Sequence, residues 1–256
     1  MHTIAFISLW GGIGQTAVVA NVATALARDG LSCLAIELCA QNSLGLCLGL
    51  EAPVPRGWVH AVQEGAWWAQ AALANSDGVG FLPYGMVDNV TADVQERRWL
   101  DQPGWLAQQL ASLDVAERSL VLLDAPQWPT AAARQAMACA DWLVVCVEAS
   151  PRVESFFPRL EALRVAQPAG QGLTLVVNRV DPRRQSQREP LQALRLQWAE
   201  FLAPYLLHED DHMPLAMARH GCVVSVLPQA QSAHDLQGIA QWLVRKFGMH
   251  SQEPSL

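Results

Sequence analysis

A glycine-rich loop at residues 11–16 constrains the fold of this chain more than any other feature of the sequence. The apolar run from Thr3 to Leu9 predicts a strand before the loop, and the pattern from about Ala17 to Asp29 predicts a helix after it. Glycines let the backbone approach a ligand closely, and the amides at the start of a helix favour anions. The loop therefore predicts a phosphate cradle, and its residues are Gly11, Gly12, Ile13, Gly14, Gln15 and Thr16.

One position of the loop departs from the common phosphate-binding pattern G-x-x-x-x-G-K-[ST]. That pattern places a lysine at position 15, where its ammonium meets the β and γ phosphates, whereas this chain has Gln15. Charge-assisted hydrogen bonds are roughly twice as strong as neutral ones, so we expect weaker triphosphate binding with the backbone cradle intact. Thr16 keeps the hydroxyl that reaches Mg²⁺ in such loops. The alternative is a tight glycine turn that binds nothing.

Short apolar runs alternate with longer helical patterns along the rest of the chain, which is typical of βαβ units and a mostly parallel sheet. Further strands are expected at residues 32–38, 80–82, 120–124, 142–147 and 173–177. Further helices are expected up to about residue 49, within a tryptophan-rich insertion at 53–77, near 103–113, from about 152, at 190–201 and at 232–247. No repeat or linker divides the chain, so we expect one domain over residues 1–250 and a flexible tail at 251–256.

Polar side chains follow three of the expected strands. Asp124 and Glu37 each end a strand, and Asn178-Arg179 ends another. Ligands of open α/β sheets bind at the carboxyl ends of the strands, so these residues are expected to converge on one crevice. Asp124 is then placed to hold Mg²⁺ through water. The alternative for each acid is that it caps the turn that follows.

Charge and hydropathy argue against several classes of partner. The formal net charge of −7 argues against bulk electrostatic binding to nucleic acid or to anionic lipid. No apolar run approaches the roughly 18 residues that span a bilayer, so we expect a cytoplasmic protein without direct membrane insertion. The six cysteines show no C-x-x-C spacing, so neither a zinc site nor a disulfide framework is expected.

Three conspicuous groups of residues have ordinary structural explanations. Trp58, Trp67 and Trp68 are expected to pack in the core, with docking of a partner as the second interpretation. Residues 208–212 place three consecutive acids between two histidines, but adjacent residues rarely converge on one metal ion, so a solvated loop is predicted. The arginine-rich run at 183–188 is predicted to be an exposed loop.

The loop and the strand-end residues resemble those of the MinD/ParA group of P-loop ATPases. That group combines a K-G-G-x-G-K-[ST] loop, a D-x-D region after the second strand, a strand-end aspartate and an N-[KR] motif. Within the group, the chain resembles the BcsQ (YhjQ) family, the cellulose synthase operon protein Q, whose loop also lacks the lysine. Three tracts carry this resemblance, at residues 56–68, 81–85 and 216–224. It implies a three-layer α/β P-loop NTPase fold with a mostly parallel central sheet.

The resemblance assigns roles to the residues at matching positions. It implies that the chain binds ATP with Mg²⁺, with the metal held by Thr16 and Asp124. Asn178 matches the residue that reads the adenine. The implied nucleotide contacts are Gly11, Gly12, Ile13, Gly14, Gln15, Thr16, Ala17, Asn178, Arg179, Pro228 and Gln229.

Departures from the group's pattern bear on hydrolysis. Trp10 replaces the signature lysine, which in the group crosses a dimer interface to the partner's phosphates, and Gln15 replaces the second lysine. Glu37 can stand in for the first acid of D-x-D. Cys39 replaces the second acid, which assists the attacking water, so fast hydrolysis is not expected.

An arginine would have to substitute for the lost lysines, because Lys246 is the only lysine in the chain. Arg152, just after the strand that ends in Glu148, is the first candidate, and Arg179 is the second. For either residue, the alternative is a solvated surface arginine.

The resemblance implies an ATP-binding accessory protein of bacterial cellulose biosynthesis and secretion. Such a protein would act as a nucleotide-dependent homodimeric scaffold with weak or no hydrolysis. Other cellulose synthase operon subunits at the inner membrane would be its partners, and would recruit it to the membrane or the cell pole. The two alternatives are an active ParA- or MinD-like partitioning or positioning ATPase, and a nucleotide-free structural scaffold.

Overall fold

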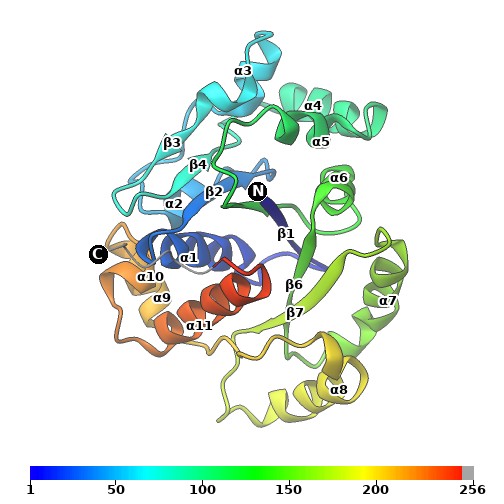
Figure 1. Cartoon of the computed structure of the whole chain (residues 1–256). Coiled ribbons are helices and arrows are strands. Elements are labelled where there is room, and N and C mark those ends of the chain that lie inside the picture. Colours follow the sequence, from blue (N-terminus) through cyan, green and yellow to red (C-terminus); the bar gives the residue numbers. More distant parts are fainter. Residues whose placement is uncertain (250–256) are drawn as a thin grey trace.

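The computed structural model, which describes residues 1–249, contains one central sheet (Figure 1). Its strands are β1 (His2–Ser8), β2 (Ser32–Glu37), β3 (Leu73–Ala74), β4 (Gly80–Leu82), β5 (Ser119–Asp124), β6 (Trp142–Glu148) and β7 (Gly172–Asn178). Within residues 1–249 these seven strands are ordered β3-β4-β2-β5-β1-β6-β7. Only β3 pairs antiparallel with its neighbour among these strands, so the predicted mostly parallel sheet is confirmed.

Helices cover both faces of the sheet. The α-helices are α1 (Gln15–Arg28), α2 (Leu44–Cys47), α3 (Trp58–Gln63), α4 (Asn89–Asp101), α5 (Trp105–Ala111), α6 (Ala131–Cys139), α7 (Phe157–Ala166), α8 (Arg188–Trp198), α9 (His212–Ala218), α10 (Val223–Val226) and α11 (Gln231–Lys246). Short 3₁₀ helices are η1 (Trp68–Ala71), η2 (Val153–Phe156), η3 (Gln185–Gln187) and η4 (Ala199–Phe201). In the part of the chain that is described, none of the helices is both long and apolar enough to cross a membrane.

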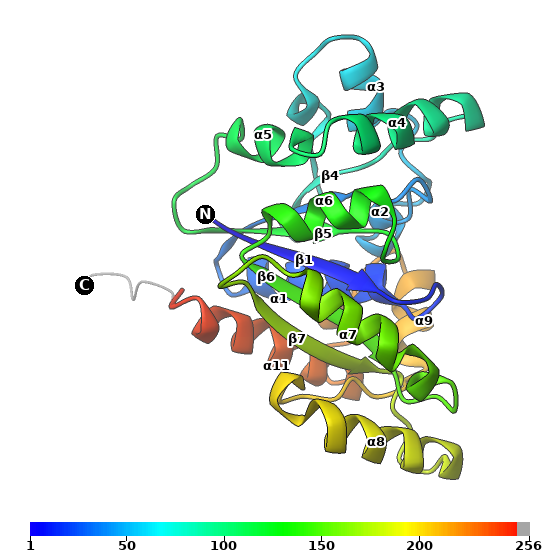
Figure 2. The ribbon, with the colours of Figure 1, turned by 90° about the vertical axis from the view of Figure 1, so that its right-hand side faces the viewer.

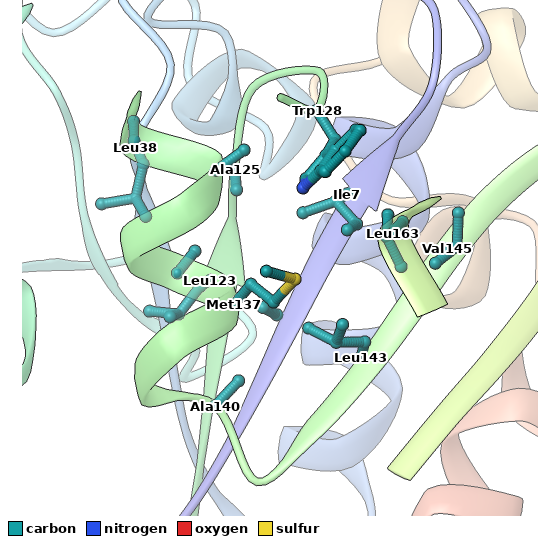
Figure 3. Close-up of a cluster of buried hydrophobic side chains, with 14 of the residues drawn as sticks. Ile7, Leu38, Leu123, Ala125, Trp128, Met137, Ala140, Leu143, Val145 and Leu163 are labelled. Atoms are coloured by element: carbon teal, nitrogen blue, oxygen red, sulfur yellow. The ribbon is translucent and has the colours of Figure 1, made fainter. Parts of the chain in front are cut away.

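The two faces of the sheet bury different side chains of the same strands. Ile4 and Phe6 of β1 join the cluster formed with α1 and α11, whereas Ala5 and Ile7 join the cluster formed with α6 and α7. Figure 2 shows α6 and α7 in front of the sheet with α1 and α11 behind it. Figure 3 shows the α6 side, where Met137 belongs to the same buried cluster as Ile7. The result is the expected arrangement of three layers.

Four helices, α4, α6, α9 and α10, are not among the expected ones. The apolar residues of α4 give no inward-facing pattern, because Val90, Val94 and Leu100 are 70%, 46% and 64% exposed. α6 has only nine residues and meets the sheet largely through alanines, which are small and only weakly hydrophobic. The expected helix near 103–113 is present as α5. The single domain predicted over 1–250 stays a prediction, and the tail predicted at 251–256 lies outside the described residues.

Tryptophan packing ties the insertion after β2 to the sheet. The Trp58 ring centroid lies 6.1 Å from that of Trp68, 5.7 Å from that of Trp99 and 5.6 Å from that of Trp105. The Trp58 Nε1 donates a 2.8 Å hydrogen bond to the carbonyl oxygen of Glu37 at the end of β2. Core packing is therefore confirmed for Trp58 and Trp68, which are 0% and 1% exposed. The prediction is wrong for Trp67, which is 50% exposed.

We predict that Trp58→Ala lowers the free energy of unfolding by about 3–5 kcal/mol, because it removes the buried centre of this aromatic cluster. Trp67→Ala is the matched control, since it deletes an indole from the same insertion at the surface, and it should cost less than about 1 kcal/mol. Urea unfolding curves of the two variants provide the measurement. Equal losses in the two variants would show that the cluster does not stabilise the fold.

Candidate functional site

The glycine loop follows the carboxyl end of β1 and opens into a hollow of about 570 Å³. Gly12 and Gly14 have φ angles of 79° and 80°, in the left-handed region that glycine adopts without strain. Gly14 is the N-cap of α1, and the amides of the first turn of a helix have no partner within the helix. Residues 11–17 all line the hollow, so the backbone forms a cradle suited to an anion.

The side-chain amide of Gln15 is hydrogen-bonded to other residues of the chain. Its Nε2 donates to the carbonyl oxygens of Phe6 and Ala125, at 3.1 Å and 2.7 Å, and to Oδ1 of Asp124 at 2.7 Å. The side chain is buried and joins the ends of β1 and β5. That Gln15 donates to a bound phosphate stays a prediction, and the contacts seen here show a second use of the same amide group.

Asp124 and Thr16 offer oxygen atoms that fit a magnesium ion. Asp124 is 0% exposed, and its Oδ2 makes no hydrogen bond to the described residues. Burial raises the pKa of Asp124 to about 6, while the Gln15 amide and the Thr16 hydroxyl partly oppose this effect. Mg²⁺ is bound in proteins through carboxylate oxygens and retained waters. An unpartnered carboxylate oxygen beside a hydroxyl is a donor set of this kind.

Glu37 lies next to Asp124 across the sheet but bonds to a different part of the chain. The two residues are register partners on β2 and β5. Oε1 of Glu37 accepts hydrogen bonds from the backbone amides of Ser43 and Leu44, which begin α2. Burial raises the pKa of Glu37 to about 7; the amide of Leu44 opposes this effect and the charge of Asp124 adds to it. The carboxylate thus holds the start of α2.

Cys39 lines the hollow at the position where the resemblance expects the second acid. Burial raises the pKa of its thiol well above the ordinary value, with smaller contributions from the charges of Asp124 and Glu37. The thiol therefore stays protonated near neutral pH and provides no base for an attacking water.

Asn178 and Arg179 reach the loop from the end of β7. Nδ2 of Asn178 donates to the carbonyl oxygen of Ile13 at 2.7 Å, and Nη1 of Arg179 donates to that of Gly12 at 2.8 Å. A second pocket of about 290 Å³ adjoins the hollow and is lined by both side chains. Arg152, the first candidate to replace the lost charge, is exposed at the start of η2 and lines neither space. The structure therefore brings Arg179 to the loop and leaves Arg152 away from it.

The predicted solvated loop at residues 208–212 is wrong for Asp210. Its Oδ2 accepts hydrogen bonds from the backbone amide and the hydroxyl of Ser232, so it holds the first turn of α11. His208 donates its backbone amide to Asp235 and lines the second pocket. No group of three metal-binding side chains occurs between residues 1 and 249.

Other residues lie where the sequence did not lead us to expect them. Pro228 and Gln229 line a separate hollow of about 270 Å³ and are absent from the lining of the pocket beside Asn178. Cys47 lines both spaces next to the loop, and Gln127 lines the hollow. The only signal for Gln127 was its place three residues after the strand-end Asp124. The run at 183–188 is not a free loop throughout, because η3 and the first residue of α8 fall within it.

The chain matches a known protein family along most of its length. The sequence model of the family described as cellulose biosynthesis protein BcsQ matches residues 1–244. The cellulose biosynthesis protein BcsQ of Escherichia coli (strain K12) is 24% identical over 240 residues, which cover 93% of this chain and 92% of that protein.

Solved structures with the same fold include proteins crystallised with nucleotides. The septum site-determining protein MinD of Pyrococcus horikoshii OT3, complexed with Mg-ADP, is 21% identical with a TM-score of 0.78, covering 98% of this chain and 99% of that chain. Cobyrinic acid a,c-diamide synthase from Mycobacterium smegmatis, with a bound ATP analog and magnesium, is 19% identical with a TM-score of 0.75, covering 100% and 99%. The predicted P-loop NTPase fold of the MinD/ParA group is confirmed.

We predict that the free energy of unfolding falls as the pH rises from about 4.5 to about 7. The pKa of Glu37 is about 7 in the folded chain against 4.5 ordinarily, so in this window the folded state keeps a proton that the unfolded state has lost. The contribution of protonated Glu37 to the free energy of unfolding is complete below the ordinary pKa of 4.5. It is lost as the pH rises through the pKa of about 7 in the folded chain. Glu37→Gln should flatten the curve by on the order of 2–3 kcal/mol.

Urea unfolding at several pH values between 4.5 and 7.5 provides the measurement. Glu96→Gln, on the exposed side of α4, is the matched control and should keep the slope of the wild-type chain. An unchanged slope in Glu37→Gln would contradict the raised pKa of Glu37.

Proposed function

Because this chain belongs to the BcsQ family of cellulose biosynthesis proteins, we propose that it is an ATP-binding accessory protein of bacterial cellulose biosynthesis and secretion. It binds ATP with Mg²⁺, forms a nucleotide-dependent homodimeric scaffold and hydrolyses ATP weakly or not at all. The observation that carries this proposal is the buried, unpartnered Oδ2 of Asp124 beside a glycine loop that opens into a hollow.

Two adjoining spaces support a nucleotide as the ligand. The hollow of about 570 Å³ beside the loop suits a phosphate chain, because backbone amides and the start of α1 face it. The pocket of about 290 Å³ shares Gly14, Ala17 and Arg179 with that hollow, and Asn178 provides an amide there. A nucleotide with its nucleobase in this pocket and its phosphates in the hollow would occupy both spaces.

In this proposal the residues of the loop bind and orient the nucleotide. The amides of residues 11–17 hold the phosphates, and Thr16 and Asp124 hold Mg²⁺. When bound, the metal neutralises charge on the phosphate chain. Glu37 is occupied by the start of α2, and the Cys39 thiol is neutral, so neither side chain is available to activate water. The chain then binds ATP but cleaves it slowly or not at all, and the bound nucleotide switches the protein between arrangements of its subunits.

The outer side of the loop supports the homodimer in this proposal. Gly11 and Gly12 are exposed there, and the half-buried Trp10 ring lies 4.3 Å from the ring of Phe156 between centroids. A second copy would cover this side and enclose the nucleotide. Other cellulose synthase operon subunits at the inner membrane would bind the dimer and recruit it there from the cytoplasm.

We predict that calorimetry with the full-length chain detects binding of ATP in the presence of Mg²⁺. Asp124→Asn should lower the affinity for ATP when Mg²⁺ is present and leave it unchanged without Mg²⁺, because asparagine removes the charge that attracts the metal. Asp93→Asn, on the exposed side of α4, is the matched control and should bind as the wild-type chain does. Phosphate release by the wild-type chain should match that of a Thr16→Ala, Asp124→Ala double variant.

Two results would overturn parts of the proposal. The absence of ATP–Mg²⁺ binding to the wild-type chain, by calorimetry and by thermal shift, would leave a nucleotide-free scaffold. Turnover well above that of the double variant would instead show an active ATPase.

We further predict that Gln15→Lys raises the affinity for ATP about tenfold, because it restores a positive charge at the loop. Gln41→Lys, which adds the same charge on an exposed part of the same hollow, is the control and should have a smaller effect. Titration of the two variants with ATP at constant Mg²⁺ provides the measurement. An unchanged or lower affinity in Gln15→Lys would show that the amide bridge to Asp124 matters more than the missing charge.

A further inference from the structure

Arg179 is the only arginine or lysine that lines the hollow beside the loop, within the described residues 1–249. It also lines the neighbouring pocket, so it stands where the two spaces meet. Its φ angle is 57°, in the left-handed region that residues other than glycine rarely adopt. A non-glycine residue held in this region requires surroundings that fix it there, and such residues often mark functional sites.

A buried glutamine holds the backbone of Arg179 in this conformation. Gln187 donates from Nε2 to the carbonyl oxygen of Arg179 at 2.9 Å and accepts at Oε1 from the backbone amide of Asp181 at 2.7 Å. Gln187 is 7% exposed. Both ends of its amide are therefore used to fix the turn after β7, which directs the Arg179 side chain onto the loop.

The guanidinium of Arg179 keeps most of its hydrogen-bonding capacity. A guanidinium has five N–H groups in a planar fork, and the bond from Nη1 to the carbonyl oxygen of Gly12 uses one of them. Asp181, the acid nearest in sequence, is paired with Arg183 and Arg184. No ion pair of Arg179 is found in the part of the chain that the structure covers.

The direction of the guanidinium places its charge against the loop. Its Nη2 and Nε lie 3.9 Å and 4.0 Å from the point that a Cβ at Gly14 would occupy. Gly14 is shared by the hollow and the pocket, so this point lies where a nucleoside would join its phosphates. Planar guanidinium groups match the geometry of phosphate oxygens well.

We propose that Arg179 binds the phosphate chain of the nucleotide from within the same subunit and provides there the positive charge that Trp10 and Gln15 lack. This inference rests on the proposed function, because it assumes a bound nucleotide. Gln187 is the positioning residue that fixes the Arg179 backbone. The contact lies at the nucleoside end of the phosphate chain, so ADP and ATP gain from it and adenosine does not.

A purely structural role makes a different prediction. If Arg179 only held the carbonyl group of Gly12, its loss would loosen the loop and lower the affinities for adenosine, ADP and ATP by similar factors. If Arg179 contacts a phosphate, its loss lowers the affinities for ADP and ATP and leaves the affinity for adenosine unchanged. The difference between ligands, rather than the size of any one effect, separates the two roles.

The experiment measures the affinities of adenosine, ADP and ATP by calorimetry for the full-length chain and its variants. Arg179→Gln should lower the affinities for ADP and ATP about tenfold and leave adenosine unchanged. Arg179→Lys should recover part of the loss, because lysine keeps the charge without the fork. Arg97→Gln, on the exposed side of α4, is the matched control.

Gln187→Ala tests the positioning role in the same assay. It should lower the affinities for ADP and ATP less than Arg179→Gln does. In combination with Arg179→Gln it should lower them no further. Equal losses for the three ligands in Arg179→Gln, or no loss for any of them, would overturn the assignment. Failure of the wild-type chain to bind all three would overturn the proposed function itself, and this inference with it.

Discussion

The hydrogen bonds of the Gln15 amide are the contact on which the rest of the site depends. They join the ends of β1 and β5 directly below the loop and leave one oxygen of Asp124 without a partner. Three oxygen atoms converge on one nitrogen that has only two hydrogens to donate. In the usual loop a lysine stands at this position, so its loss is not simply a missing charge. The glutamine keeps the strand ends together in an otherwise acidic, buried environment.

A second set of contacts holds the strand end beside it. Glu37 fixes the start of α2 through two backbone amides, and its own carbonyl oxygen accepts the indole N–H of Trp58. The insertion, the second strand and the short helix α2 are thus attached at one residue. This explains why an acid at a motif position can be buried completely and serve the fold instead of the chemistry.

Much of the fold could be predicted from the sequence, and less of the site. β5 was predicted because every residue of it is buried, which makes the apolar run continuous. α4 could not be, because its valines face solvent and its buried residues, Gln95 and Trp99, are few. The loop and Asp124 follow from local pattern, whereas the choice of Arg179 over Arg152 depends on Gln187 and on the turn after β7. Such choices rest on contacts between distant segments, which a local pattern does not contain.

The tryptophan cluster that joins the insertion to α4 and α5 has a spectroscopic consequence. Contacting indole rings among Trp58, Trp68, Trp99 and Trp105 have centroids 5.1–6.1 Å apart, most of them edge to face. Rings this close and fixed in orientation couple their electronic transitions, so they give a strong near-ultraviolet circular dichroism signal. The Trp10 ring lies apart from them at the loop, against Phe156. Among the ten tryptophans of the chain, this cluster reports optically on the packing of the insertion against α4 and α5, and Trp10 reports on the surroundings of the loop.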